Sequence, residues 1–507
     1  MTSPRPAAET PRPLSLAAAA TLVGASLALT AALAALVTLD LLPRGNAQWS
    51  WPLLTPPAPW GVAAIAALGA AVLAALLVGD RLRAAAPPSR ATAAVLLVVL
   101  LALGLLTCGG VALHNPRYPA QAPLVVLSDL ALGYYNLAAQ LPGPAEAFSG
   151  HLARAREERV PDRIRTHPPG PVLLMMALRE AALSRPQALA GLEAWLARSF
   201  GLTPELLRRA ARGGTTATLS PLDALVALPV AWLLTLLPAL IVLPAYGLGA
   251  ALADRRVGLA AALLSLALPA LLCFTPGIDG VGAVIAATAV WWWAAALRAG
   301  RWWLYLLAGL GAAAALLWSY GYLALAPVAL VLAWPGARGD QRLRLSAVGL
   351  SVAVAAFVVV YGVLDAATGY SLPASLRASL HAQAAIMARE GRDYFSWLAL
   401  NPYGFALFCG PGLLLLFAAG LRSGAGEPGR LGRAVLATLI LLLLLGTTRA
   451  EVERIWVFLM PLLAVTAAGP LSRLPRSLAL WGPALLVAAQ VAWALTLMGQ
   501  WALVVPY

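Results

Sequence analysis

One aspartate and two tyrosines begin an otherwise apolar stretch, LSDLALGYYNLAAQL, at residues 127–141. Asp129 is the only charged residue of this stretch, and Tyr134 and Tyr135 follow it on an expected helix. An aspartate at such a position often caps a helix N-terminus. In apolar surroundings a carboxyl group can instead have a raised pKa and act as a general base. The stretch alone leaves both interpretations open.

A second stretch, RIRTHPPGPVLLMM at residues 163–176, puts Arg163, Arg165 and His167 directly before an apolar segment. The planar fork of arginine suits phosphate because it donates two hydrogen bonds at once. The prolines suit the first turn of a helix, whose N-terminal dipole also favours an anion. The stretch therefore predicts a phosphate-facing corner, and the alternative is charge that faces lipid headgroups.

Two further groups of charges stand at short turns between apolar runs. The turn FTPGIDG carries Asp279, the only charged residue between Arg256 and Arg298. Such an aspartate is either a plain turn residue or, at the edge of a membrane, a functional acid. The turn TTRAEVERIWVF gathers four charged residues that either pair with one another or recruit a charged headgroup: Arg449, Glu451, Glu453 and Arg454.

The composition defines the elements that must position these side chains. The chain has 507 residues, of which 61% are hydrophobic and only 11% charged. Soluble domains contain about a quarter charged residues, so the composition indicates a polytopic membrane protein. The net charge of +14 comes from arginine without any lysine, and no basic stripe interleaved with aromatic residues predicts nucleic-acid binding. The three cysteines have no metal-ligand spacing.

The sequence contains thirteen apolar runs whose lengths are close to that needed to cross a bilayer. They predict an all-α protein with about thirteen transmembrane helices. A crossing needs about 20 apolar residues. The runs lie near 15–42, 60–79, 92–113, 223–252, 257–274, 281–298, 302–318, 321–334, 345–366, 403–421, 433–447, 455–472 and 478–501.

The distribution of arginine predicts the orientation of these helices. If the N-terminus is cytoplasmic and residues 170–184 do not cross, every short cytoplasmic connection holds at least two arginines, as the positive-inside rule expects. The segments at about 114–222 and 367–402 then lie outside the cell membrane, and all four charged groups and His381 are exterior. Within the first segment, residues 170–184, 186–198 and 204–212 are expected to form helices that lie on the membrane surface.

The order of these motifs resembles the GT-C superfamily of membrane glycosyltransferases, which includes protein O-mannosyltransferases and lipid A aminoarabinose transferases. Members have many spans and a long first exterior loop that contains an early acid and surface-lying helices. They also have a later acid after a Thr-Pro pair. The features that match are Asp129, His167-Pro168-Pro169 and Thr275-Pro276 with Asp279. Ser128 replaces the first acid of the usual pair, and Gly277 replaces the acid expected directly after Thr-Pro.

The resemblance divides the chain into an extra N-terminal two-helix segment, 1–91, and a GT-C-like membrane domain, 92–507. It implies that Asp129 is the general base and that Asp279 assists it or, with Asp129, helps to hold a divalent cation such as Mg²⁺ or Mn²⁺. It also implies that His167, with Arg163 or Arg165, and Arg454 contact a donor phosphate. Supporting roles fall to Tyr134, Tyr135, Glu451, Glu453 and His381.

The resulting function is transfer of a hexosyl or pentosyl group from a polyprenyl-phosphate donor to an exterior acceptor. That acceptor would be a glycan, lipid or protein of a bacterial cell envelope, and the enzyme would be a multi-pass protein of the plasma (inner) membrane. Two alternatives stay open. One is a transporter or flippase of lipid-linked intermediates, which would show inverted repeats and ionisable residues deep in the spans. The other is an inactive scaffold with the same fold.

Overall fold

The computed structural model describes residues 13–46, 50–55, 57–84, 86–115, 117–212, 214–215, 217–334, 339–422 and 426–503. Across these ranges the secondary structure is helical, apart from two isolated β-bridges. The predicted all-α class is therefore confirmed. Residues 1–12, which were expected in the cytoplasm with Arg5 and Arg12, lie outside the described part of the chain.

Helices form at all thirteen predicted apolar segments. In the described ranges, eight are long and apolar enough to cross a membrane. Their bounds are α1 Leu16–Thr38, α2 Val62–Arg83, α3 Arg90–His114, α12 to α13 Pro221–Leu252, α16 Asp279–Ala299, Ala347–Thr368 within α19 (Gly339–Thr368), α23 Glu427–Leu445 and α26 Trp481–Gln500. The number of crossings stays a prediction, because several other segments are shorter.

The shorter segments include three apolar helices: α17 Trp302–Trp318, η2 to α18 Tyr320–Ala333, and η4 to α25 Val457–Ser472. A fourth segment is divided into α14 Arg255–Leu266 and α15 Pro269–Cys273. Nearly every residue of α14 and α25 is buried, and the two helices pack against each other. A helix that is apolar on all sides lies either inside a protein or in a bilayer, and these two are covered by protein. They therefore form the centre of the bundle.

The prediction of one continuous spanning helix at 403–421 is wrong. Helix α21 (Tyr394–Cys409) begins nine residues before the predicted span, and a bend of 100° separates it from α22 (Pro411–Arg422). The bend is at Gly410, whose φ of 94° is a conformation that glycine adopts without strain. The Gln490 side chain occupies the space that a Cβ atom at Gly410 would need.

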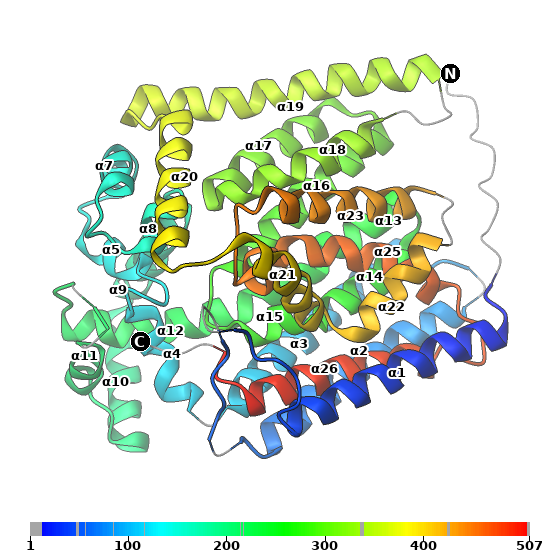
Figure 1. Ribbon diagram of the computed structural model, residues 1–507, viewed down its shortest axis with the longest axis horizontal. Helices are drawn as coiled ribbons and strands as arrows, with labels where there is room; N and C mark the ends of the chain where they lie inside the picture. Colours follow the sequence, from blue (N-terminus) through cyan, green and yellow to red (C-terminus); the bar gives the residue numbers. More distant parts are fainter. Residues whose placement is uncertain are drawn as a thin grey trace.

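The short helices of the two long segments that were predicted to be exterior gather at one end of the bundle, on the left of Figure 1. From the first segment come α4 Tyr118–Leu127, α5 Tyr134–Gln140, α6 Pro144–Ser149, α7 His151–Arg156, α8 Asp162–Thr166, α9 Gly170–Leu183, α10 Pro186–Phe200 and α11 Pro204–Ala211. Helix α20 (Leu372–Arg389) comes from the second segment and packs against α7 and α8. Helices α9, α10 and α11 confirm the predicted helices at 170–184, 186–198 and 204–212.

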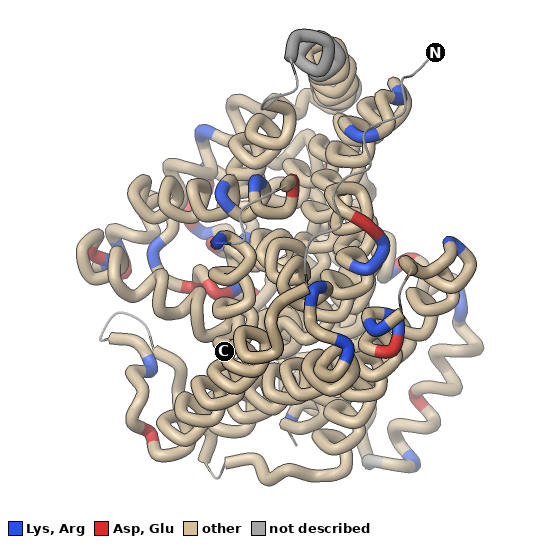
Figure 2. Tube along the Cα trace, turned by 90° about the vertical axis from the view of Figure 1, so that its right-hand side faces the viewer, with Lys and Arg blue, Asp and Glu red and all other residues tan. Residues whose placement is uncertain are grey.

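At the opposite end of the bundle, which faces the viewer in Figure 2, arginine side chains form hydrogen bonds with backbone carbonyls of other segments. Arg255 donates to the carbonyl of Pro88 at 2.8 Å, and Arg298 donates to the carbonyl of Ala251 at 2.9 Å. Ala251 lies in the last turn of α13, where carbonyl groups lack partners within the helix, so a cation there is favourable. The arginines that predict orientation therefore also tie the short connections together.

Candidate active site

The segment that precedes α9 is fixed by close backbone packing. A Cβ atom at Gly170 would lie 2.3 Å from the carbonyl oxygen of Leu317, at the end of α17. Only glycine permits this approach. At the other end of α9, Arg179 forms a 2.7 Å ion pair with Asp223 of α12. The contacts with α17 and α12 therefore hold the sequence RTHPPG and the helix that follows it in one defined position.

Four charged side chains from three distant parts of the chain form a cluster, called here the Arg454 cluster. Arg454 lies 3.3 Å from the Asp279 carboxylate and also pairs with Glu451. Glu451 in turn lies 3.8 Å from Arg163. Each of these side chains is less than a quarter exposed. Two arginines and two carboxylates thus meet at the N-terminal end of α16.

The charges within the cluster control the ionisation of Glu451. Burial raises the pKa of this carboxyl, but the positive charges of Arg454, Arg163 and Arg392 outweigh it and lower the pKa to about 2. Glu451 is therefore ionised at neutral pH. The Arg454 guanidinium is disfavoured by burial, but Glu451 and Asp279 raise its pKa overall. Both members of the pair stay charged because each stabilises the other.

Backbone geometry holds Glu451 in this place. Ala450 and Glu451 have φ values of 71° and 58°, in the left-handed region that residues with a Cβ atom rarely adopt. Asn401 of α21, which is 2% exposed, holds the turn. Its Nδ2 donates to the carbonyl of Thr448 at 2.9 Å, and its Oδ1 accepts from the Ala450 N–H at 3.2 Å. Asn401 was not among the predicted site residues, and the Asn-Pro pair at 401–402 was the only signal for it.

His167 lies beside the cluster as a neutral imidazole. Its Nδ1 is 3.0 Å from the Arg163 carbonyl and must donate the hydrogen bond, because a carbonyl only accepts. Burial and the Arg163 charge lower its pKa to about 4. The Tyr134 ring packs edge-on against the imidazole at 5.8 Å. At neutral pH the Nδ1–H is committed to backbone, and the positive charges near the site are those of arginine.

Asp129 does not cap a helix, so the N-cap interpretation is wrong. Helix α5 begins five residues later, at Tyr134, and Gly133 at its N-cap has a φ of 70°. The Ser128 hydroxyl instead accepts from the Ala131 N–H at 3.1 Å. Asp129 accepts a 2.7 Å hydrogen bond from Asn136 Nδ2, which also binds the Leu127 carbonyl. Asn136 was not predicted as a site residue.

Arg163 connects the Asp129 turn to the Arg454 cluster. Its Nε donates to the carbonyl of Leu130 at 3.0 Å, and its Nη2 lies 3.8 Å from Glu451. Asp279 is in the same cluster through Arg454. A continuous set of contacts therefore runs from Leu130 through Arg163 and Glu451 to Arg454. Asp129 directly precedes Leu130 at one end, and Asp279 contacts Arg454 at the other.

Four predicted residues lie away from this cluster. Arg165 is directed to Asp162 at 3.5 Å, and its carbonyl accepts from Ser379 of α20. The Tyr135 hydroxyl donates to the Asp223 carbonyl at 3.0 Å and so ties α5 to α12. His381 is exposed on α20. Glu453 is buried next to Trp51 and lines a different cavity with Asn401.

The residues that could hold a divalent cation do not build a metal site by themselves. Asp279 pairs with Arg454, and the Asp129 oxygen Oδ1 accepts from Asn136. Within the described ranges no group of three or more His, Cys, Asp or Glu side chains is arranged to hold a metal ion. An arginine at 3.3 Å from Asp279 would repel a cation there.

A large apolar cavity opens between the helices of the bundle. It has a volume of about 270 Å³ and is lined by residues of α16, α17, α18 and α19. Its lining includes Leu323, Leu350 and Val354, which are 48%, 39% and 50% exposed on the outer face of these helices. At its inner end, the Tyr322 hydroxyl would touch a Cβ atom at Gly282, in the first turn after Asp279. Tyr322 therefore lies between the cavity and the first turn of α16.

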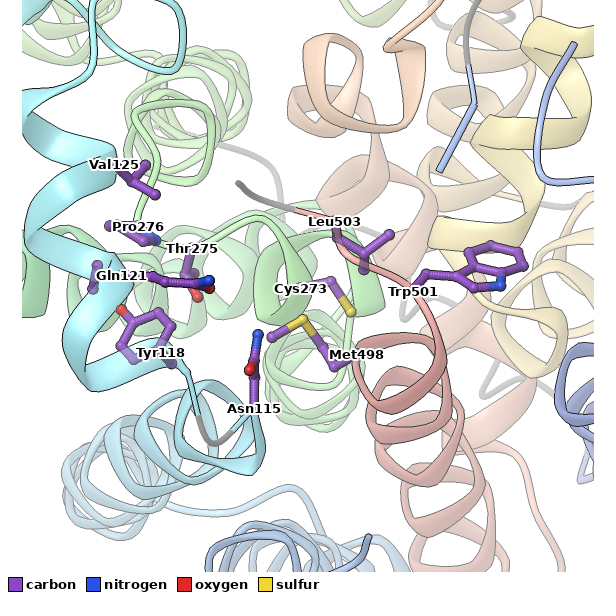
Figure 3. A pocket seen from close by; sticks show the side chains of 11 residues that line it. Asn115, Tyr118, Gln121, Val125, Cys273, Thr275, Pro276, Met498, Trp501 and Leu503 are labelled. Atoms are coloured by element: carbon purple, nitrogen blue, oxygen red, sulfur yellow. The ribbon is translucent and has the colours of Figure 1, made fainter. Parts of the chain in front are cut away.

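Figure 3 shows a separate, narrow cavity beside the Thr275–Pro276 turn. Asn115, Tyr118 and Gln121 direct their side chains toward Thr275 across it. Met498 and Cys273 form its other wall. No charged residue lines this cavity, so its chemistry does not match an anionic group.

Comparison with known proteins gives little similarity. No protein-family model matches the chain, and no curated protein matches it in sequence. Among solved structures, the oligosaccharyltransferase of Archaeoglobus fulgidus, crystallised as a complex with zinc and sulfate, is similar with a TM-score of 0.36 and 14% sequence identity. The match covers 78% of this chain and 53% of that chain, so this chain spans about half of that protein.

Proposed function

We propose that this protein is a membrane glycosyltransferase of GT-C type. It moves a sugar from a polyprenyl-phosphate donor to a hydroxyl-bearing acceptor on the exterior side of a bacterial plasma membrane. The acceptor is a glycan, lipid or protein of the cell envelope. The observation that carries the proposal is the buried arginine pair at the N-terminal end of α16, together with an apolar cavity lined by later residues of the same helix.

The two parts of the site match the two parts of such a donor. The Arg454 and Arg163 side chains offer forked N–H donors to a phosphate in a poorly hydrated place, where charge-assisted hydrogen bonds are strong. The apolar cavity begins at Tyr322, beside the first turn of α16, and can accommodate an isoprenoid chain. A soluble nucleotide sugar has no part that would use this cavity.

The chemistry needs a base and a stabilised leaving group. The acceptor oxygen forms a bond to the anomeric carbon while the bond from that carbon to the phosphate oxygen breaks. The acceptor proton passes to the Asp129 carboxylate, whose Oδ1 is oriented by Asn136. The electron pair stays on the phosphate, and Arg454 and Arg163 stabilise its developing charge. Asp279 keeps the Arg454 guanidinium in position.

The test is transfer from radiolabelled polyprenyl-phosphate hexoses and pentoses to envelope extracts by the purified protein. We expect transfer by the wild type and a loss of about 10²–10⁴-fold in kcat for Asp129→Asn, the scale of general-base catalysis. Full activity of Asp129→Asn would remove the assignment of the base. Donor binding without turnover in any acceptor mixture would favour an inactive scaffold, and movement of intact donor between leaflets would favour a flippase.

A further inference from the structure

Glu451 occupies the position at which the two arginines would meet a phosphate. It pairs with Arg454 and lies 3.8 Å from Arg163, so it contacts both groups assigned to the donor. A carboxylate and a phosphate use the same guanidinium fork. Both cannot occupy the fork of Arg454 at the same time.

The local backbone separates this pair from ordinary helical ion pairs. Glu427 and Arg430 have the same spacing of three residues and pair at 3.0 Å within the regular helix α23. Glu451 instead precedes its helix and follows Ala450, and both residues have positive φ. A non-glycine residue in the left-handed region is strained, and such strain concentrates at ligand-binding and switching segments.

The charge of the site points to exchange. A polyprenyl-phosphate sugar is a phosphodiester with one negative charge, so replacing the Glu451 carboxylate by it leaves the charge around the arginines unchanged. Burial of the arginines without either anion would be costly. The strong lowering of the Glu451 pKa supports an ionised carboxylate in the absence of donor.

We propose that Glu451 is an exchangeable counter-ion that holds Arg454 and Arg163 when no donor is bound and is displaced by the donor phosphate. The inference rests on the proposed function, because it takes the phosphate to be that of a lipid-linked donor. After transfer, return of Glu451 to the arginines competes with the remaining polyprenyl phosphate and promotes its release.

The experiment measures equilibrium binding of farnesyl phosphate to the purified full-length protein in lipid nanodiscs. Farnesol serves as the uncharged probe, and inorganic phosphate as the probe without a chain. In Glu451→Gln the competing charge is absent while the side-chain volume is kept. We expect farnesyl phosphate to bind about tenfold more tightly than to wild type, the scale of one charge-assisted hydrogen bond, with farnesol binding unchanged.

Glu427→Gln is the matched control, because it removes a carboxylate from an ion pair of the same spacing far from the cluster. A backbone variant gives an independent measurement. Ala450→Gly removes the strain of the donor-free turn, so it should weaken farnesyl phosphate binding by two- to tenfold. Asp40→Gly relieves a comparable positive φ elsewhere and should not change binding.

The results separate this inference from the proposed function. If wild type and Glu451→Gln both fail to bind farnesyl phosphate in preference to farnesol, the assignment of the donor site is wrong. The exchange proposed for Glu451 is then overturned as well. If wild type binds farnesyl phosphate but Glu451→Gln binds it equally or more weakly, Glu451 only positions the arginines, and the exchange alone is overturned. Tighter binding by Ala450→Gly would also overturn it.

Discussion

The Asn401 side chain and the Ala450 backbone are joined by a 3.2 Å hydrogen bond that links α21 to the strained turn of the Arg454 cluster. The same amide donates to Thr448 at 2.9 Å. Helix α21 thus holds the backbone on which Glu451 and Arg454 are placed.

Replacing Asn401 by alanine should destabilise the protein. The change leaves the Thr448 carbonyl and the Ala450 N–H without these partners in a buried place, which costs about 1–3 kcal/mol for an unsatisfied buried group. Thermal unfolding in detergent should show a lower Tm for Asn401→Ala. Gln140→Ala, an exposed change on α5, should keep the wild-type Tm. Equal Tm values would mean that the turn does not depend on Asn401.

Arg454 and Arg165 should differ strongly in a lysine exchange. Lysine keeps the charge but loses the planar fork, so Arg454→Lys should weaken farnesyl phosphate binding at least tenfold. Arg165 is directed to Asp162, so Arg165→Lys should change the affinity less than twofold. Both affinities can be measured by isothermal titration calorimetry. A larger loss in Arg165→Lys would restore Arg165 as the phosphate contact.

Glu453 should make stability depend on pH. Burial raises the pKa of this carboxyl to about 7, against an ordinary value of 4.5. Between these values the folded protein holds a proton that the unfolded chain releases, so this residue lowers stability as pH rises from 4.5 to 7. The loss is about 3 kcal/mol for a shift of this size.

Glu453→Gln removes this dependence. Its Tm relative to wild type should increase between pH 5 and pH 8 and stay level above pH 8. His167 and His151 have lowered pKa values and act in the opposite sense at acidic pH, but they are present in both proteins and cancel in the difference. A constant difference across this range would show that Glu453 is ionised at pH 5.

Filling the apolar cavity should reduce affinity for a long isoprenoid chain. Ala312 of α17 lines the cavity, and a phenylalanine there would occupy part of its volume. Ala312→Phe should weaken binding of undecaprenyl phosphate about tenfold through lost apolar burial, whereas inorganic phosphate binding should not change. Ala314→Phe makes the same change on an exposed position of the same helix and provides the control. Equal affinities in the two variants would place the chain elsewhere.

The helical segments were predictable because each helix of a membrane protein is an apolar run that the local amino-acid composition reveals. The run 281–298 and the helix Asp279–Ala299 agree within two residues, since an uninterrupted apolar stretch has one stable structure in a bilayer. The prediction for the segment at 403–421 was wrong because hydropathy contains no information on a change in the direction of the helix axis. Its break depends on the φ of Gly410 and on the packing of Gln490, 80 residues away in sequence.

The candidate site was predictable in its charged members and not in its supports. Arg163, Asp279 and Arg454 were identified because charges are rare in an apolar chain. Asn136 and Asn401 were not, because an amide that holds a carboxylate or a turn looks the same in sequence as an exposed one. The choice between Arg163 and Arg165 also depends on tertiary structure, since two residues of one short helix point in different directions.

The bend at Gly410 makes the Arg454 cluster sensitive to a residue in the middle of a long apolar run. Helix α21 ends at this bend and packs against α24, which contains Arg454. A side chain at position 410 would have to move Gln490 or rotate α21 about the bend. Such a rotation would displace Asn401, which lies in the same helix. The charged cluster would then respond to packing among the apolar helices.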